Sequence, residues 1–290
     1  MRLKKSSLSE RWYPKNTVDI SNFLSKFATS ASDKAVSVAI APHAGWFYSG
    51  RIAAKAVACL DRKAETLVVI GGHLPAGREP LFAMEDAVET PLGDMTIDAE
   101  LRTALLGEIG GQEDRFQDNT VEVLLPMTRF FFPNASLLWM RLPADMSSFE
   151  AGRALAAVAK KLGRRLAVLA SADLTHYGQS YGFAPSGTGP EALRWVREIN
   201  DRRFLEAVES GDPAAVLQRA NADRSTCSAG AVLGAMGFAQ ATAAGSARLI
   251  EYGTSANAEN DGMPEAFVGY AAVAFSGEFG RPEGWLVEVC

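Results

Sequence analysis

The sequence predicts one α/β domain in which a mainly parallel central sheet is flanked by helices. The first reason is that short apolar runs rich in Val, Ile and Leu alternate with Ala- and Leu-rich segments of helical spacing. Such runs are typical of strands buried on both faces, and these strands build parallel sheets that helices cover. The second reason is that no internal repeat or low-complexity linker interrupts the alternation. Residues 1–290 are therefore expected to form a single domain.

The expected elements alternate along the chain. Strands are predicted at residues 35–41, 66–71, 136–142, 165–170, 247–252 and 267–275. Helices are predicted at residues 49–60, 98–106, 149–162, 191–210, 212–220 and 229–241. A Gly- and Pro-rich stretch at 183–190 is short enough to be a surface loop or a lid.

Composition and charge exclude several classes of protein. Hydrophobic residues make up 48% of the chain and charged residues 22%, as in ordinary globular proteins. The net charge of -5 argues against a nucleic-acid surface, which would be basic. The basic N-terminal residues are not followed by an apolar stretch, and no window reaches the roughly 20 apolar residues of a membrane span. We expect a cytoplasmic protein that binds neither nucleic acid nor a membrane.

The three histidines of the chain each follow the end of an apolar strand run. His43 follows AVSVAIAP, His73 follows TLVVIGG, and His176 follows RLAVLAS. In α/β sheets, ligands bind beyond the carboxyl ends of the strands. A single histidine there is most often held by a backbone carbonyl, but three with none elsewhere favour a shared metal or catalytic site, because neutral imidazole is a common metal ligand.

Asp173 precedes His176 by three residues in SADLTHYG. On a helical turn the two side chains share a face and could address one centre. Alternatively, Asp173 orients an imidazole through its second nitrogen, or it caps a helix that follows the strand. The spacing alone does not separate these roles.

The chain has three cysteines, an odd number that argues against a disulfide framework. Cys227 is the one whose position suggests a chemical role. It lies in STCSAG, directly before the helix predicted from residue 229, and the positive end of a helix dipole favours the thiolate form that binds metals. The alternative is a small buried apolar residue, the usual fate of free cysteine. Cys59, inside an apolar helix, and Cys290, the last residue, are expected to be non-catalytic.

These segments resemble those of the Memo family. PHAGWFYSG at residues 42–50 is similar to the family signature PHAGY-x-YSG. Further matching segments follow in order along nearly the whole chain: WYP at 12–14, GGH at 71–73, ETPLG at 89–93, VEVLLP at 121–126, SADLTHYG at 171–178 and STCSAG at 225–230.

The resemblance implies a fold similar to the class III extradiol dioxygenases, whose non-haem iron lies at one end of a central sheet. Carried over residue by residue, it makes His43, His73 and Cys227 metal ligands and places Asp173 and His176 at the same pocket. Iron as Fe²⁺ is the expected ion, with copper or zinc as alternatives, and a soft thiolate favours copper or redox-active iron more than a carboxylate would. The expected ligand is a small molecule or a peptide. Family resemblance adds radical-SAM and AMMECR-type proteins as partners.

The chain departs from the family pattern in one place that bears on chemistry. Where relatives carry a histidine in EHS-x-E, this chain reads DNTVE, with Asn119 at the histidine position and Glu122 retained. The leading hypothesis is a metal-dependent, dioxygenase-like oxidoreductase with His176 as general acid and base and Asp173 orienting it. The second is a non-enzymatic adaptor that binds metal or peptide in the same pocket, which Asn119 favours.

Overall fold

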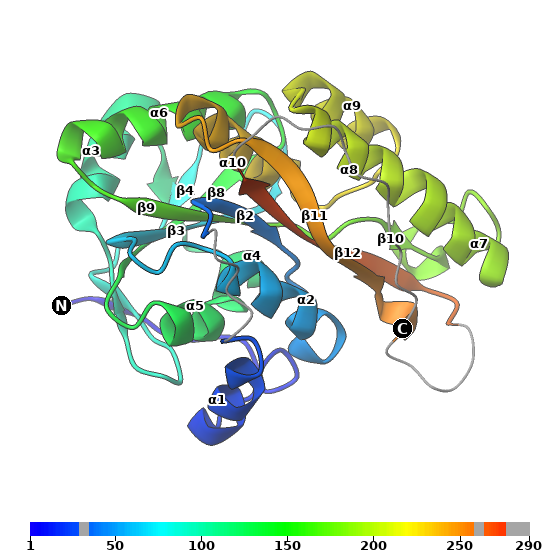
Figure 1. Ribbon diagram of the computed structural model, residues 1–290, viewed down its shortest axis with the longest axis horizontal. Coiled ribbons are helices and arrows are strands. Elements are labelled where there is room, and N and C mark those ends of the chain that lie inside the picture. The colour runs from blue at the N-terminus through cyan, green and yellow to red at the C-terminus, as the bar shows by residue number, and fades with distance from the viewer. Residues whose placement is uncertain (29–34, 258–263, 277–290) are drawn as a thin grey trace.

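A mixed β-sheet runs through the centre of the molecule, as the computed structural model of residues 1–28, 35–257 and 264–276 shows (Figure 1). Within these residues its strands are β2 (Val38–Ala41), β3 (Thr66–Leu74), β4 (Leu81–Phe82), β7 (Gln112–Glu113), β8 (Ser136–Pro143), β9 (Leu166–Ser171), β10 (His176–Tyr177), β11 (Ser246–Thr254) and β12 (Phe267–Ser276). Their order is β10-β12-β2-β9-β3-β8-β4-β7, and β11 pairs with residues 269–276 of β12. All six predicted strands are present.

The expectation of a mainly parallel sheet is correct only for its centre. Strands β2, β9, β3 and β8 are mutually parallel neighbours. Strand β12 runs antiparallel to β2, β10 and β11, and β4 runs antiparallel to β8. Strands β11 and β12 are consecutive in the chain and pair directly, and a connection without a crossover gives antiparallel neighbours.

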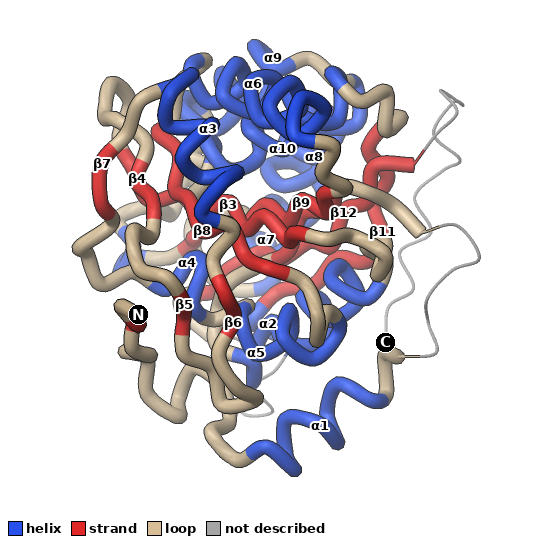
Figure 2. Tube along the Cα trace, turned by 90° about the vertical axis from the view of Figure 1, so that its left-hand side faces the viewer, coloured by secondary structure: helices blue, strands red, loops and turns tan. Residues whose placement is uncertain are grey.

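Helices cover both faces of the sheet (Figures 1 and 2). One layer contains α3 (Ala99–Ile109), α6 (Ser147–Leu162), α8 (Asp201–Ser210), α9 (Pro213–Ala222) and α10 (Ala229–Ala241). The other contains α1 (Thr17–Ser25), α2 (Trp46–Ala58), α4 (Asn119–Glu122) and α5 (Leu125–Phe131). The helix predicted at 191–210 is divided into α7 (Pro190–Trp195), a π-helical turn at Val196–Asn200, and α8. None of the helices in the described residues is long and apolar enough to cross a membrane.

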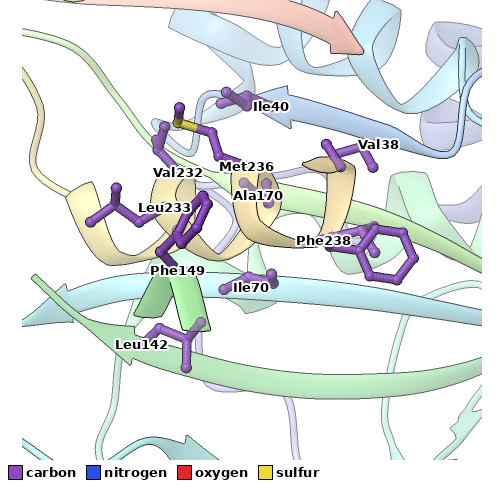
Figure 3. Packing of buried hydrophobic residues seen from close by; sticks show 14 of the residues in the cluster. Val38, Ile40, Ile70, Leu142, Phe149, Ala170, Val232, Leu233, Met236 and Phe238 are labelled. Carbon is purple, nitrogen blue, oxygen red and sulfur yellow. The ribbon is translucent and has the colours of Figure 1, made fainter. Parts of the chain in front are cut away.

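Helix α10 is apolar on all sides because it lies between the sheet and α6. Its Val232 and Met236 pack near Ile40 and Ile70 of the sheet (Figure 3). On the side that faces α6, a Cβ at Gly237 of α10 would collide with the carbonyl oxygen of Phe149, and a Cβ at Gly152 of α6 would collide with the carbonyl oxygen of Gly234, so these positions require glycine. The start of α10 is packed as closely against the carboxyl ends of β3 and β8, because Ser228 lies against Gly72 and Gly230 lies against the carbonyl groups of Leu142 and Pro143.

A second, three-stranded sheet ties the N-terminus to the body of the domain. It consists of β1 (Leu3–Lys4), β5 (Ala87–Val88) and β6 (Met95–Thr96), in the order β1-β5-β6. The carboxylate of Glu122 then accepts hydrogen bonds from the backbone N–H groups of Ser7 and Leu8, both at 2.8 Å, and from the Tyr13 hydroxyl at 3.0 Å. Glu122 is buried, so this residue of the family motif anchors the N-terminal segment.

Asp201, the first residue of α8, is buried behind the strand that carries His176. Its carboxylate accepts the Thr175 N–H at 3.1 Å and the Tyr252 hydroxyl at 2.7 Å, and no cation pairs with it among the described residues. Burial therefore raises the pKa of Asp201 to about 7, against an ordinary value of 3.8.

We expect the stability of the protein to fall between about pH 4 and pH 7 through Asp201. In that window the folded state keeps the proton on Asp201 and the unfolded state releases it, so folding is disfavoured as pH rises, by on the order of a few kcal/mol at pH 8. Asp201→Asn removes the titration because an amide does not ionise. The contact with Tyr252 is kept, because the amide N–H can donate to the Tyr252 oxygen as a protonated carboxyl group would. Urea denaturation at pH 5 and pH 8 should show the variant gaining on the wild type at pH 8. Parallel pH profiles of the two proteins would refute this assignment.

Candidate metal centre

Three side chains that could bind a metal converge at the carboxyl edge of the central sheet. His43 follows β2, His73 lies near the end of β3, and Cys227 lies two residues before the start of α10. One ligand atom from each lies within 4.8 Å of the other two, and the rings of His43 and His73 are perpendicular with centroids 5.0 Å apart. Parallel strands end at one edge, and for this reason residues remote in the sequence meet here.

Hydrogen bonding fixes the orientation of His43. Its Nδ1 lies 2.9 Å from the hydroxyl oxygen of Ser171, and that hydroxyl donates its only hydrogen to the carbonyl oxygen of Thr120. Ser171 must therefore accept from His43, so Nδ1 carries the proton. The other nitrogen, Nε2, faces the Cys227 sulfur at 3.2 Å. It is the atom available to a metal.

His73 sits on a distorted part of β3. The pairing with β8 shifts register between Gly71 and Leu74, as at a β-bulge, and His73 has a φ of 57°, which is uncommon outside glycine. A side chain at Gly72 would collide with Ser228. The bulge thus turns His73 toward the pocket while glycine lets β3 approach the segment that carries Cys227.

The sulfur of Cys227 lies in an environment that favours the thiolate. Burial by itself would raise the pKa of Cys227, but the positive charge and hydrogen bond of His43, followed by those of His73, lower it well below its ordinary value. The sequence predicts a contribution from the start of the following helix, and the structure adds the two histidines, whose contacts with the sulfur the sequence did not specify. Cys59 is different, since burial raises its pKa to about 12. Cys290 lies outside the described residues.

The two histidines respond to the same cluster. Burial lowers the pKa of His73, but the hydrogen bond to Asp118 and the contact with Cys227 outweigh it and raise that pKa to about 10. For His43, burial again lowers the pKa, and the nearby Asp173 and Cys227 raise it above its ordinary value. The cluster of one thiolate and two imidazoles is therefore suited to a positive charge.

Asp173 contacts His43, not His176. Its Oδ1 accepts the backbone N–H of His43 at 2.7 Å, and its Oδ2 lies 3.8 Å from His43 Nε2. The segment after β9 leads into β10 without a helix, so of the roles left open by the sequence the helical turn and the helix N-cap at Asp173 are both excluded. The backbone carbonyl of Asp173 also accepts hydrogen bonds from Thr226 Oγ1 and Cys227 N, which holds the cysteine loop in place.

His176 lies apart from the three-residue cluster but lines the same cavity. Its Nδ1 is 3.1 Å from the carbonyl oxygen of Leu174, which can only accept, so Nδ1 carries the proton and Nε2 is free to take or give one. The ring of Tyr181 contacts it edge-on at 5.1 Å between centroids.

A cavity of about 420 Å³ opens beside the cluster. Aromatic side chains supply much of its wall: Trp12, Tyr48, Tyr181 and Tyr270. Tyr48 and Tyr181 are 42% and 41% exposed, which places them where the cavity meets solvent. Asn119 also lines the cavity, and its amide donates to the carbonyl oxygen of His43 at 3.1 Å. The asparagine at the family histidine position thus has a backbone contact.

Sequence reasoning missed two residues that support the cluster. Asp118 accepts from His73 Nδ1 at 2.9 Å, and Arg141 of β8 contacts Asp118. Asp118 does carry a sequence signal. Asp is a preferred N-cap residue, and its side chain accepts the backbone N–H two residues later, here that of Thr120. Arg141 is a charged residue inside a buried apolar run, which calls for a partner.

Comparisons with known proteins agree with these segments. The family described as Memo-like protein matches residues 4–274. A MEMO1 family protein of Methanosarcina mazei is 26% identical over 283 residues, covering 94% of this chain and 99% of that protein. Similar proteins of Methanococcoides burtonii and Methanopyrus kandleri are 27% and 29% identical, covering 93% and 81% of this chain and 99% and 82% of their own lengths.

Among solved structures, the chain is similar to an uncharacterized protein of Escherichia coli K12. The match has a TM-score of 0.46 and 16% sequence identity, and it covers 81% of this chain and 98% of that one.

Proposed function

The chain belongs to the family of Memo-like proteins, and from this premise we propose that it is a metal-dependent oxidoreductase whose iron or copper ion is held by His43, His73 and Cys227. The observation that carries the proposal is the convergence of two imidazoles and one thiolate within 4.8 Å at the edge of the sheet. Fe²⁺ is the favoured ion, with copper next and zinc as a redox-inactive alternative.

The donor set fits such an ion. Both histidines hold a proton on Nδ1 and present Nε2 to the cluster, and the thiol is poised as thiolate. Two nitrogens and a soft sulfur suit a redox-active transition metal better than Mg²⁺ or Ca²⁺, which take oxygen ligands. When bound, the ion supplies electron transfer to the reaction.

The remaining residues of the cavity act on the substrate and its protons. His176 exchanges a proton through Nε2 while the Leu174 carbonyl holds Nδ1–H. Asp173 fixes the backbone of His43, and this replaces the sequence-based role of orienting His176. The aromatic wall offers an apolar surface for a small molecule. Because the Memo resemblance implies a fold similar to that of the class III extradiol dioxygenases, we infer a dioxygenase-like oxidation within a single domain of residues 1–290.

His176→Ala tests the division of labour between binding and chemistry. We expect the variant to keep most of its iron or copper and to lose oxygen consumption by about 10²- to 10⁴-fold, the usual contribution of a general acid or base. Anaerobic purification, elemental analysis and an oxygen electrode with a panel of small aromatic compounds would measure both quantities. A loss of metal would instead make His176 a ligand, and wild-type protein without stoichiometric redox metal would refute the oxidoreductase.

A binding or adaptor role is the second candidate. Asn119 favours it, because an amide bound to the His43 carbonyl cannot serve as the acid or base that a histidine at this position could be. In that case the cavity holds a peptide or small ligand without turning it over, and radical-SAM and AMMECR-type proteins are the partners to test. Stoichiometric metal with no turnover and with ligand binding in the cavity would support this candidate.

A further inference from the structure

A buried chain of charged groups runs from His73 into the core. His73 Nδ1 donates to Asp118 Oδ2 at 2.9 Å, and Arg141 Nη2 lies 3.2 Å from the same oxygen. Arg141 Nη1 lies 3.3 Å from Asp114 Oδ1. The other carboxylate oxygen of Asp114, Oδ2, accepts the indole N–H of Trp139 at 3.0 Å. The side chains of Arg141 and Asp114 are 4% and 0% exposed. Burying three charges is costly, so the arrangement calls for a purpose beyond stability.

Arg141 holds His73 from two directions. Its Nε donates at 3.0 Å to the carbonyl oxygen of Gly72, the residue before His73, and its Nη2 holds the carboxylate that receives the His73 ring. Arg141 pairs with Gly71 in the β3–β8 register, directly before the bulge. The guanidinium therefore fixes both the backbone and the ring partner of His73.

Further hydrogen bonds hold the carboxylate of Asp118 itself. Its Oδ1 accepts the Thr120 N–H at 2.9 Å and the Thr120 hydroxyl, so the carboxylate caps α4 through one oxygen and receives His73 and Arg141 through the other. The two cluster histidines thus differ: His43 donates to the neutral hydroxyl of Ser171, and His73 donates to an anion. An anionic partner makes an imidazole the stronger electron donor and fixes its orientation more firmly.

We propose that Asp118 is the positioning residue of the metal site: its carboxylate accepts a hydrogen bond from the Nδ1–H of His73 so that Nε2 faces the ion, and the buried Arg141 and Asp114 hold the carboxylate there. The inference rests on the proposed function, since it assigns the metal ion to the cluster. It goes beyond that function by making His73 the histidine whose ligand strength is set from the core.

The chain contains a matched control for Asp118. Asp98 also caps a helix, accepting the Leu101 N–H at 3.0 Å, and it also receives a threonine hydroxyl, Thr66 Oγ1 at 2.6 Å, and an arginine, Arg164 Nε at 3.4 Å. Its side chain is 7% exposed, against 9% for Asp118. It lies beside the start of β3, at the opposite end of the sheet from His73, and therefore shares the structural roles of Asp118 without contacting the cluster.

The test compares Asp118→Asn with Asp98→Asn. An amide cannot accept from His73, Arg141 and Thr120 together, because one of its two ends is a donor. We expect Asp118→Asn to bind Zn²⁺ about 10- to 100-fold more weakly in chelator competition, as for other outer-shell partners of metal-bound histidine, and Asp98→Asn to bind it like the wild type. Asp118→Ser replaces Asp118→Asn in the test if the asparagine variant folds poorly. Serine keeps the helix cap but is too short to reach His73, so we expect the same loss of Zn²⁺ affinity.

A second readout does not depend on metal. With only three histidines in the chain, the downfield imidazole N–H protons can be assigned in NMR spectra. The His73 Nδ1–H signal should be protected from exchange in wild type and Asp98→Asn and lost in Asp118→Asn. Wild type that binds no Zn²⁺ would overturn the proposed function and the role toward a metal with it. Wild type that binds Zn²⁺ with an unchanged affinity in Asp118→Asn would overturn the assignment of Asp118 alone.

Discussion

Replacing His73 by alanine should lower the metal content of the purified protein severely while leaving its fold intact. Removing one of three ligands costs on the order of 3 kcal/mol of binding free energy, roughly a hundredfold in affinity. The His73 side chain is 32% exposed and contributes little to packing. We therefore expect the free energy of unfolding to change by about 1 kcal/mol or less. Iron and copper analysis together with circular dichroism and urea denaturation would measure both effects.

His43 requires a different substitution. Its side chain is 2% exposed, whereas that of His73 is 32% exposed, so His43 is also part of the packing around the site. His43→Ala would lose packing as well as metal, at a cost of about 2 kcal/mol or more. His43→Gln keeps most of the volume and can still donate to Ser171, and it should lose metal as His73→Ala does. Full metal content in both variants would remove the cluster as a metal site.

The fold could be predicted where the sequence has strong periodicity and not elsewhere. The central strands are continuous apolar runs, and this signal does not depend on their neighbours. The direction of β12 depends on its connection to β11, which no local pattern reveals. Helix α1 was missed because only Ile20 and Leu24 of its residues are buried, too few for a clear helical period. The π-helical turn before Asp201 is likewise a local irregularity inside a helical pattern.

The site could be predicted as far as the rule of strand ends reaches. His43, His73 and His176 each follow a strand, so their proximity could be inferred. Asp173 and His176 would share one face only on a helical turn, and the chain does not form a helix between β9 and β10. Asp118 was missed because it follows no apolar run, and Arg141 because it lies within one. Arg141 meets His73 through the pairing of β3 with β8, and Asp118 reaches it from the start of α4. Both contacts depend on tertiary structure, which no local pattern reveals.

Cys227 should be alkylated quickly in metal-free protein and slowly in metal-loaded protein. The thiolate is the reactive form, and the contacts with His43 and His73 favour it by keeping the pKa of Cys227 well below its ordinary value. A bound ion would occupy the same sulfur lone pairs and block the reagent. Iodoacetamide labelling followed by peptide mass spectrometry would give the rate at each cysteine.

Cys59 provides the internal reference for that measurement. Its pKa is raised to about 12 by burial, and its sulfur donates to the Ala56 carbonyl at 3.0 Å, so it should react slowly whether or not metal is present. A Cys227→Asp variant replaces the soft sulfur by a hard oxygen and should shift preference from copper toward Fe²⁺. Metal competition in that variant distinguishes a ligand from a residue that a bound ion merely shields. A cysteine that is not a ligand could be shielded by the ion, but its replacement would not change which ion is preferred. Equal labelling rates with and without metal, together with unchanged preference, would make Cys227 a small buried residue beside the site.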